Sequence, residues 1–318
     1  MSSSSFGHIG VLMGGYSSER EISLRSGSAV ARALTDGGYT VKSIDITTSD
    51  RPKIIELLKK SGIDVAFIAL HGRLGEDGQI QSILEELGIP YTGSGPAASQ
   101  KAFNKITAQT AFKNAGLSIP ENFYISDGRL VHFKDVFGVL KKLPFVVKSA
   151  CEGSSIGVYM VRHPSGWESA LKDALALGPF VLVEKFIKGR EVTVGIFDGQ
   201  PLPLVEIVTR NPLFDFNSKY QKGLTDYVVP AQLPDELTKK IQSMALSAYD
   251  VLGCEGFARV DVRIDETRRP YILEINTIPG FTETSLFPKA AAKAGYSFLQ
   301  VCEKLLDLAY AHDKKIQR

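Results

Sequence analysis

The stretch from Phe257 to Asn276 reads FARVDVRIDETRRPYILEIN and predicts a β-hairpin with one charged face. Polar and apolar residues alternate along its first arm, which is the period-two pattern of a strand with one buried face. Turn-forming residues follow, and the second arm alternates again. The expected polar face holds Arg259, Asp261, Arg263, Glu274 and Asn276, and the expected apolar face holds Ala258, Val260, Val262, Ile264, Tyr271, Leu273 and Ile275.

The charged face is expected to line a cavity, because burying it against a core would strand its charges at a cost of several kcal/mol each. Asp261, Glu274 and Asn276 offer hard oxygen donors, which suit Mg²⁺ shared between protein and phosphates. Arg259 beside them could hold a developing oxyanion. A solvated hairpin face is the alternative. The next residues, TIPGFT, favour the site, because Pro and Gly break the strand and let the backbone approach a ligand.

The composition bounds the class of protein. A chain of 318 residues with 44% hydrophobic residues is long enough for two or three domains. It has no apolar run of the ~20 residues that a membrane span needs and no signal-peptide pattern, so we expect a cytoplasmic protein without membrane contact. A net charge of +2 with dispersed basic pairs argues against nucleic-acid binding. Three widely spaced cysteines argue against disulfides and a cysteine-based zinc site.

The N-terminal segment alternates strand and helix patterns up to about Ser94, which predicts a parallel α/β sheet. His71 follows the last buried strand pattern, at the carboxyl end where open α/β sheets keep their ligands. The segment GSGPAA from Gly93 fits a relaxed dinucleotide fingerprint. Its internal proline, and the lack of an acidic residue about 20 positions later, argue against a nicotinamide site.

The segment CEGSSIG, residues 151–157, is a small-residue loop after a strand pattern that ends at Lys148. Such loops present backbone N–H groups and hydroxyls to phosphate, with a lysine as point charge. The loop also matches Gly-x-Ser-x-Gly, with Ser155 as the nucleophile of a serine hydrolase. That alternative needs a helix after Gly157, whereas VYMV predicts a strand, and the chain offers only His163 and His312 as weakly supported bases. Cys151 lacks a convincing histidine partner and is expected to be a bystander thiol.

Three further segments bear on a ligand site. The run EKFIKGRE from Glu184 suits an adenine edge and a ribose hydroxyl, and suits an ordinary charged connection equally well. Lys105 is expected to be solvated on a helix over residues 101–115. The long polar stretch from Thr209 to Tyr227 predicts a lid.

Together these motifs resemble the D-alanine–D-alanine ligases of the ATP-grasp superfamily. The resemblance runs over nearly the whole chain and rests on GGYSSEREISLRSG from Gly14, ALHGRLGEDGQIQ from Ala69, KSACEGSSIGV from Lys148, EKFIKGREVTVGI from Glu184 and LEINTIPGFTETSLFPKAA from Leu273. It implies an α/β and α+β fold, in which a Rossmann-like (pre-ATP-grasp) domain over residues 1–97 precedes a two-lobed ATP-grasp fold. The central lobe, 98–187, would carry the nucleotide and phosphate loop. The C-terminal lobe, 188–318, would carry the lid (209–227), the metal-binding hairpin and the second D-alanine site.

The resemblance implies an ATP-dependent ligation of two D-alanines through a D-alanyl phosphate, for peptidoglycan precursors, by a cytoplasmic homodimer that uses two Mg²⁺ ions or Mn²⁺. The implied ATP ligands are Lys105, Lys148, Ser154, Ser155, Glu184, Lys185, Ile187, Glu191 and Lys219, and the implied metal ligands are Asp261, Glu274 and Asn276.

The resemblance also implies substrate and catalytic roles. Glu19 would receive the ammonium of the first D-alanine, with His71 near its carboxylate, and Ser154 would link Glu19 to Tyr220 of the lid. Ser285 and Leu286 would bind the carboxylate of the second D-alanine. Arg259 and the Gly280 N–H would form the oxyanion hole, and Lys219 would neutralise phosphate charge.

The chain departs from several relatives in two places. Phe214 and Phe216 replace lid tyrosines, and Asn104 stands where some relatives have aspartate. The alternatives are another ATP-grasp carboxylate–amine ligase, a D-alanine–D-lactate or D-serine ligase, and a regulatory ATP-binding module. Tyr220 favours amide formation, because the resemblance implies that ester-forming relatives often carry a histidine there, whose charge would repel the ammonium of D-alanine.

Overall fold

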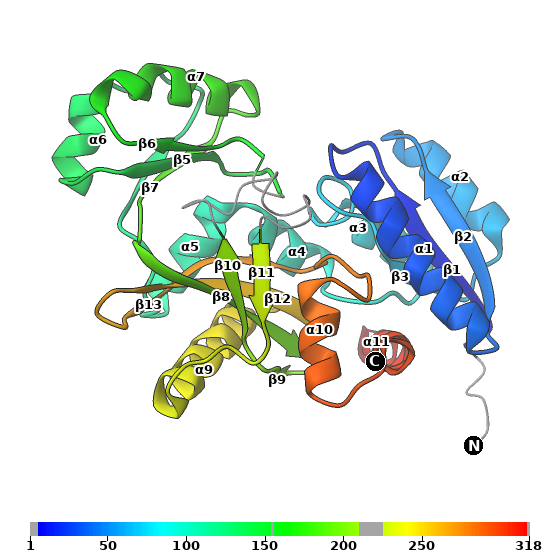
Figure 1. The fold of residues 1–318 in the computed structure, drawn as a ribbon. Helices are drawn as coiled ribbons and strands as arrows, with labels where there is room; N and C mark the ends of the chain where they lie inside the picture. Colours follow the sequence, from blue (N-terminus) through cyan, green and yellow to red (C-terminus); the bar gives the residue numbers. More distant parts are fainter. Residues whose placement is uncertain (1–5, 154–155, 210–224, 317–318) are drawn as a thin grey trace.

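The computed structural model describes residues 6–153, 156–209 and 225–316, with side chains to residue 311. A parallel sheet of order β2-β1-β3 forms the N-terminal part (Figure 1), as the sequence predicted. Its elements are β1 (His8–Gly14), α1 (Arg20–Asp36), β2 (Thr40–Ile46), α2 (Arg51–Ser61), β3 (Val65–Ile68) and α3 (Gln79–Leu87). The last helix, α11 (Phe298–Ile316), packs against α1 and β3, so the chain returns to this core at its end.

A second, fully antiparallel sheet of order β4-β7-β5-β6 lies under two helices (Figure 1). Its elements are β4 (Asn122–Ile125), α6 (Phe133–Leu140), β5 (Phe145–Ser149), β6 (Val158–Val161), the short 3-10 helix η1 (Pro164–Gly166), α7 (Trp167–Ala176) and β7 (Val181–Lys185). The fully buried Trp167 packs in its core. Strand β6 follows the small-residue loop, so the helix that a serine hydrolase needs there is not formed.

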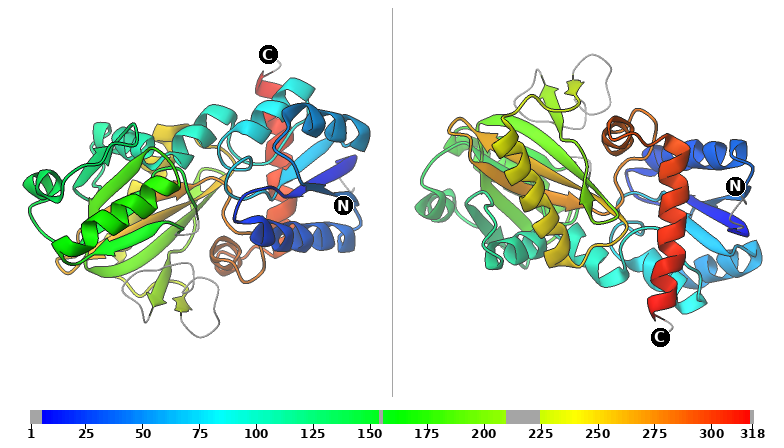
Figure 2. Two further views of the ribbon diagram at one scale, coloured as in Figure 1. Left: turned by 90° about the horizontal axis from the view of Figure 1, so that it is seen from above. Right: turned by 90° about the horizontal axis from the view of Figure 1, so that it is seen from below.

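The third sheet, of order β11-β10-β8-β12-β13 with β9 beside β8, contains the charged hairpin. Its elements are β8 (Gly189–Phe197), β9 (Gln200–Pro201), β10 (Val205–Thr209), β11 (Thr225–Val228), α9 (Asp235–Leu252), β12 (Phe257–Asp265), β13 (Pro270–Asn276) and α10 (Leu286–Lys293). Seen from below, α9 lies across this sheet and α11 lies beside the N-terminal sheet (Figure 2). Strands β12 and β13 pair antiparallel, which confirms the predicted hairpin.

A β-bulge changes the apolar face of β13. Asp261 pairs with Glu274 but Val262 pairs with Ile272, so Leu273 is the extra residue. Ile272 and Ile275 are therefore both buried in the core, whereas Leu273 and Glu274 both line a pocket. The prediction that Tyr271 and Leu273 share the apolar face with Ile275 is wrong: Tyr271 pairs with Arg263 of the polar face, because strict alternation does not survive an inserted residue.

The helix expected over residues 101–115 is two helices, α4 (Pro96–Phe103) and α5 (Lys105–Asn114). Asn104 separates them in an extended conformation, and its Oδ1 accepts hydrogen bonds from the N–H groups of Ile106 (3.0 Å) and Thr107 (3.2 Å). An aspartate carboxylate could cap α5 in the same way, so Asn104 preserves this role. Lys105 enters the first turn of α5 and is buried, so the prediction of a solvated lysine is wrong.

The two ends of the predicted lid are strand residues, because Thr209 belongs to β10 and Tyr227 to β11, which pair antiparallel. Phe214, Phe216, Lys219 and Tyr220 lie outside the described residues, as do Ser154 and Ser155. In the part of the chain that the structure describes, no helix combines the length and apolar character that crossing a membrane requires.

Candidate active site

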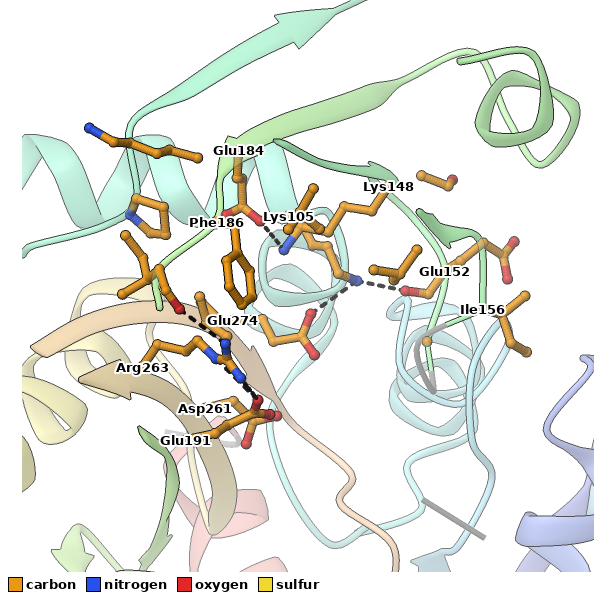
Figure 3. A pocket seen from close by; sticks show the side chains of 18 residues that line it. Lys105, Lys148, Glu152, Ile156, Glu184, Phe186, Glu191, Asp261, Arg263 and Glu274 are labelled. Atoms are coloured by element: carbon orange, nitrogen blue, oxygen red, sulfur yellow. Dashed lines mark hydrogen bonds and ion pairs between the residues drawn. The ribbon is translucent and has the colours of Figure 1, made fainter. Parts of the chain in front are cut away.

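A pocket opens where β5, β6 and β7 of the central sheet face β8, β12 and β13 of the C-terminal sheet (Figure 3). Apart from Ser149 and Gly153, its lining is of two kinds. The apolar side chains are Pro120, Val146, Ile156, Val158, Phe186, Ile187 and Leu273, and the charged ones are Lys105, Lys148, Glu152, Glu184, Lys185, Glu191, Asp261, Arg263 and Glu274. An apolar wall beside convergent charges suits a ligand with a flat ring and an anionic tail.

Lys148 and Glu184 form an almost completely buried ion pair on adjacent strands, with Nζ 2.5 Å from Oε2. The second oxygen of Glu184 accepts a hydrogen bond from the Gln109 amide. Gln109 also donates to the Leu273 carbonyl (3.1 Å) and accepts from Asn122 (2.8 Å), which links α5 to both sheets. Gln109 could not be predicted as part of the site, because a glutamine in a helical pattern carries no signal of its partners.

Lys105 connects the small-residue loop to the hairpin. Its Nζ donates to the Glu152 carbonyl (2.6 Å) and lies 3.3 Å from Glu274 Oε2. Burial lowers the pKa of Lys105, but the charge of Glu274 and its hydrogen bond outweigh burial, so the pKa is raised. Lys105 therefore stays a cation at neutral pH and can meet an anionic ligand.

The three predicted metal ligands lie on neighbouring positions of the hairpin. Asp261 pairs directly with Glu274, and Asn276 pairs with Arg259. Arg259 donates two hydrogen bonds of 2.9 Å to Asp261, whose Oδ1 also accepts from Thr193 Oγ1 (2.6 Å). Among the described residues, no group of three or more His, Cys, Asp or Glu side chains is arranged for a metal. Two carboxylates and an amide oxygen on adjacent cross-strand positions nevertheless form a donor set that fits Mg²⁺.

Arg263 lies directly opposite Glu191 in the pairing of β12 with β8. Its Nε and Nη2 donate to Glu191 Oε2 (3.2 and 3.0 Å), and its Nη1 donates to the Ile187 carbonyl (3.0 Å). The guanidinium also lies 5.0 Å from the centre of the Phe186 ring. The sequence placed Arg263 on the polar face but gave no sign of these contacts. Lys185, the other predicted adenine ligand, extends toward Glu121 (3.4 Å) at the surface.

Glu19 is buried where the N-terminal domain meets the small-residue loop. A Cβ atom added to Gly153 would lie 2.5 Å from Glu19 Oε2, and one added to Gly72 would lie 2.8 Å from it. Gly72 also has a φ of +69°, which favours glycine, whereas a side chain at Gly153 would push the Glu19 carboxylate out of its present position. The structure thus brings Glu19 next to the loop that contains Ser154.

His71 is buried between the N-terminal domain and the segment after the hairpin. Its Nδ1 lies 3.0 Å from the Ile278 carbonyl, and its Nε2 lies 3.0 Å from Ser26 Oγ. The Ser26 hydroxyl accepts a hydrogen bond from the Phe281 N–H (3.2 Å). His71 therefore joins the segment that contains Gly280 to the domain that contains Glu19.

Glu76, which the sequence analysis did not single out, lies 3.5 Å from His71 Nδ1 and is also buried. Burial raises the pKa of its carboxyl group, the hydrogen bond with His71 opposes this shift, and the charge of Glu19 adds to it. Two carboxyl groups and an imidazole thus converge beside the loop.

Ser285 precedes α10, and its Oγ accepts a hydrogen bond from the Thr282 N–H (3.0 Å) and lies 2.8 Å from Thr282 Oγ1. A Cβ atom added to Gly280 would lie 3.4 Å from the same Oγ. Gly280 and Ser285 are therefore neighbours, and Leu286 follows as the first residue of the helix.

Residues 112–307 match the family model described as D-ala D-ala ligase C-terminus, and residues 48–94 match D-ala D-ala ligase N-terminus. The chain belongs to the D-alanine–D-alanine ligase family. A relative from Desulforudis audaxviator, called D-alanine--D-alanine ligase, is 48% identical over 305 residues, which are 95% of this chain and 98% of that protein. Another of that name, from Syntrophotalea carbinolica, is 45% identical over 94% of each chain.

Solved structures of the family share the fold. The D-alanine–D-alanine ligase of Bacillus anthracis in complex with ATP superposes with a TM-score of 0.85, at 31% identity, over 97% of this chain and 99% of that one. The ligase of Coxiella burnetii gives a TM-score of 0.84 at 26% identity, over 99% of this chain and 97% of that one. The predicted ATP-grasp fold is therefore confirmed.

Proposed function

We propose that this protein uses ATP to join two D-alanine molecules into D-alanyl-D-alanine. The observation that carries the proposal is a pocket that places two buried lysines, Lys105 and Lys148, beside the acidic hairpin of Asp261 and Glu274. Family membership supports it, as does the Bacillus anthracis relative described as complexed with ATP.

ATP would lie with its adenine along the apolar wall and its phosphates at the lysines. Glu184, Lys185 and Ile187 would meet the adenine edge, and Glu191 would meet the ribose. Lys105 and Lys148 contact carboxylates in the structure. The phosphate oxygens of ATP would replace these carboxylates or bind the same lysines beside them. Lys219, Ser154 and Ser155 complete the proposed phosphate site from outside the described residues.

The metal site would consist of Asp261, Glu274 and Asn276. Two Mg²⁺ ions, or Mn²⁺, would supply neutralisation of phosphate charge there. Arg259 holds the Asp261 carboxylate through two hydrogen bonds, which orients this donor before a ligand arrives.

The chain's own residues can carry both chemical steps. Glu19 would hold the ammonium of the first D-alanine, whose carboxylate oxygen attacks the γ-phosphorus of ATP, so that ADP leaves and an acyl phosphate forms. The amine of the second D-alanine, held through its carboxylate by Ser285 and Leu286, then attacks the acyl carbon. Arg259 and the Gly280 N–H would stabilise the tetrahedral oxyanion before phosphate leaves.

His71 would lie near the carboxylate of the first D-alanine and link that subsite to the segment that contains Gly280. Its ring is fixed on one side by Ser26 and on the other by the Ile278 carbonyl, near the proposed oxyanion donor Gly280. Ser154 would connect Glu19 to Tyr220, and the closeness of Gly153 to Glu19 supports that link. A closed lid would keep water from the acyl phosphate. We also propose a role in peptidoglycan precursor synthesis, in the cytoplasm, as a homodimer.

The direct test is incubation with ATP, Mg²⁺ and D-alanine, with mass analysis for the dipeptide and ADP. We expect ADP only when D-alanine is present, and L-alanine serves as the control. Competition between equal D-alanine and D-lactate should give mainly the amide. ATP turnover that ignores D-amino acids would overturn the proposal in favour of another ATP-grasp ligase, binding without turnover would favour a regulatory module, and labelling of Ser155 by a fluorophosphonate would favour a hydrolase.

The metal site has its own test in Glu274→Gln, which keeps the size of the side chain but removes its charge. The Mg²⁺ concentration for half-maximal turnover should rise by at least about tenfold. Glu266→Gln is the matched control, because Glu266 lies in the same hairpin and pairs with Lys188 at the surface (2.7 Å). Equal Mg²⁺ responses of the two variants would show that Glu274 is not a ligand.

A further inference from the structure

One side chain of the C-terminal sheet, Arg263, contacts the connection between the two lobes from inside the pocket. Strand β7 ends at Lys185 and β8 begins at Gly189, so residues 186–188 join the central sheet to the C-terminal sheet. Arg263 of β12 donates to the Ile187 carbonyl in this connection and lies over the ring of Phe186. The same guanidinium donates twice to Glu191.

These contacts form inside the pocket and not at the surface of the protein. The side chains of Arg263 and Glu191 are only 11% and 12% exposed, and both line the pocket with Phe186 and Ile187 (Figure 3). An ion pair at such low exposure is weakly screened, so it holds its two partners in one geometry. Lysine is not an equivalent replacement, because its ammonium is a point charge and lacks the planar fork of donors with which the guanidinium contacts Glu191 twice and the Ile187 carbonyl once.

We propose that Arg263 is a positioning residue that sets the affinity for the nucleotide by acting through Glu191 and the 186–188 connection. The inference rests on the proposed nucleotide site, in which Glu191 meets the ribose and Ile187 the adenine. Arg263 neutralises Glu191 and fixes its rotamer, so the carboxylate is already oriented to accept from ribose hydroxyls. It also fixes the backbone that forms the apolar wall, so less conformational entropy is lost when ATP binds.

The chain contains a control with the same hydrogen-bond pattern, although the Arg190 side chain is 40% exposed and that of Arg263 only 11%. Arg190 also donates two hydrogen bonds to one glutamate on a neighbouring strand, Glu206 (2.6 Å each), and one to a backbone carbonyl, that of Gln232 (2.9 Å). The described pocket-lining residues include Arg263 and Glu191 but neither Arg190 nor Glu206. The Arg190→Met variant therefore shows how the kinetic constants respond when an arginine–glutamate pair between strands is lost outside the pocket.

The experiment compares Arg263→Met, Arg263→Lys and Arg190→Met in steady-state kinetics. Arg263→Met should raise the KM for ATP by about 10- to 100-fold, the range for hydrogen bonds to charged groups, and change kcat and the KM for D-alanine by less than about threefold. Arg263→Lys should fall between the wild type and Arg263→Met, and Arg190→Met should leave all three constants unchanged. A similar rise in the KM for ATP in Arg190→Met, or an equal loss in kcat for Arg263→Met, would overturn the proposal.

The preference for ribose over deoxyribose gives a second measurement. Loss of an ion pair with a purely structural role would not change this preference. The wild type should prefer ATP to 2′-deoxy-ATP and 3′-deoxy-ATP, and Arg263→Met should lose this preference. If Arg263 acts through Glu191, the double variant with Glu191→Gln should be within about twofold of the worse single variant. Retained discrimination in Arg263→Met would overturn the inference. Calorimetry with ATP alone tests Arg263 even if D-alanine ligation fails, so the two proposals can fail separately.

Discussion

The Lys148–Glu184 pair in the pocket and the Arg51–Glu86 pair on the N-terminal domain have almost the same geometry. Their nitrogen–oxygen distances are 2.5 and 2.6 Å. Their surroundings differ, because the pocket side chains are 7% and 3% exposed whereas the surface side chains are 46% and 51% exposed. Distance alone would give the two pairs the same importance.

The difference teaches that desolvation decides what such a pair does. Water and salt screen the surface pair, so forming it gains little and losing it costs little. The side chains of the pocket pair are shielded from water and contact protein groups instead, so removal of one member leaves an uncompensated buried charge. A phosphate ligand can use this situation, because it offers Lys148 a new anionic partner in place of Glu184.

Lys148→Met should have the largest effect on stability. It leaves the Glu184 carboxylate buried without its cation, which costs about 3–5 kcal/mol in comparable pairs. We expect the urea midpoint, followed by circular dichroism, to fall accordingly, and ATP with Mg²⁺ to stop protecting the protein. The double variant Lys148→Met/Glu184→Gln should recover part of the loss. A midpoint equal to that of Arg51→Met would contradict the role assigned to desolvation.

Arg259→Ala should have the next largest effect: it lowers turnover, and it also costs some stability, because the Asp261 carboxylate is only 10% exposed and loses its cation. Arg259 is a proposed oxyanion donor, and loss of one such donor typically lowers kcat by about 10² to 10³. Asp261 keeps its hydrogen bond from Thr193, so the hairpin should remain folded. The measurement is the rate of ADP release at saturating ATP and D-alanine, with the thermal midpoint as control. A kcat within threefold of the wild type would remove Arg259 from the oxyanion hole.

The hairpin shows how much the sequence could predict. Alternation placed Asp261, Arg263 and Glu274 on one polar face because a strand period of two is a local property, and the structure confirms that these three side chains line the pocket. The bulge at Leu273 escaped prediction, because it depends on how β13 fits β12 and leaves no mark in the composition of the strand.

Lys105 and Arg263 show why the rest of the site could not be predicted from local patterns. The helix break at Asn104 turns Lys105 into a buried residue, although an asparagine within a helical pattern looks neutral. Arg263 has two partners that are distant in the sequence. Glu191 lies on β8, 72 residues earlier, and Ile187 lies in the connection before that strand, 76 residues earlier. The roles of Glu19, His71 and Ser285 were predicted from the family resemblance and not from local patterns, and they stay predictions.

The Arg73–Glu152 pair is intermediate between the two extremes, with side chains 48% and 16% exposed and a distance of 3.1 Å. It joins the N-terminal domain to the loop whose Glu152 carbonyl holds Lys105. Arg73→Ala should raise the KM for D-alanine by about threefold, in keeping with a partly exposed pair. The charge-swapped variant Arg73→Glu/Glu152→Arg should restore part of the affinity, and an unchanged KM in Arg73→Ala would show that the pair does not position the loop.

Arg51→Ala should have the smallest effect, at most about 0.5 kcal/mol on the free energy of unfolding. Beyond screening, Arg51 is the first residue of α2, where Asp50 caps the helix and the helix dipole disfavours a positive charge. This repulsion offsets the attraction to Glu86, so the variant could equal the wild type. A double-mutant cycle with Glu86→Ala, by urea unfolding at low and high salt, measures the coupling. A coupling above about 1 kcal/mol would mean that the short distance, and not exposure, governs these pairs.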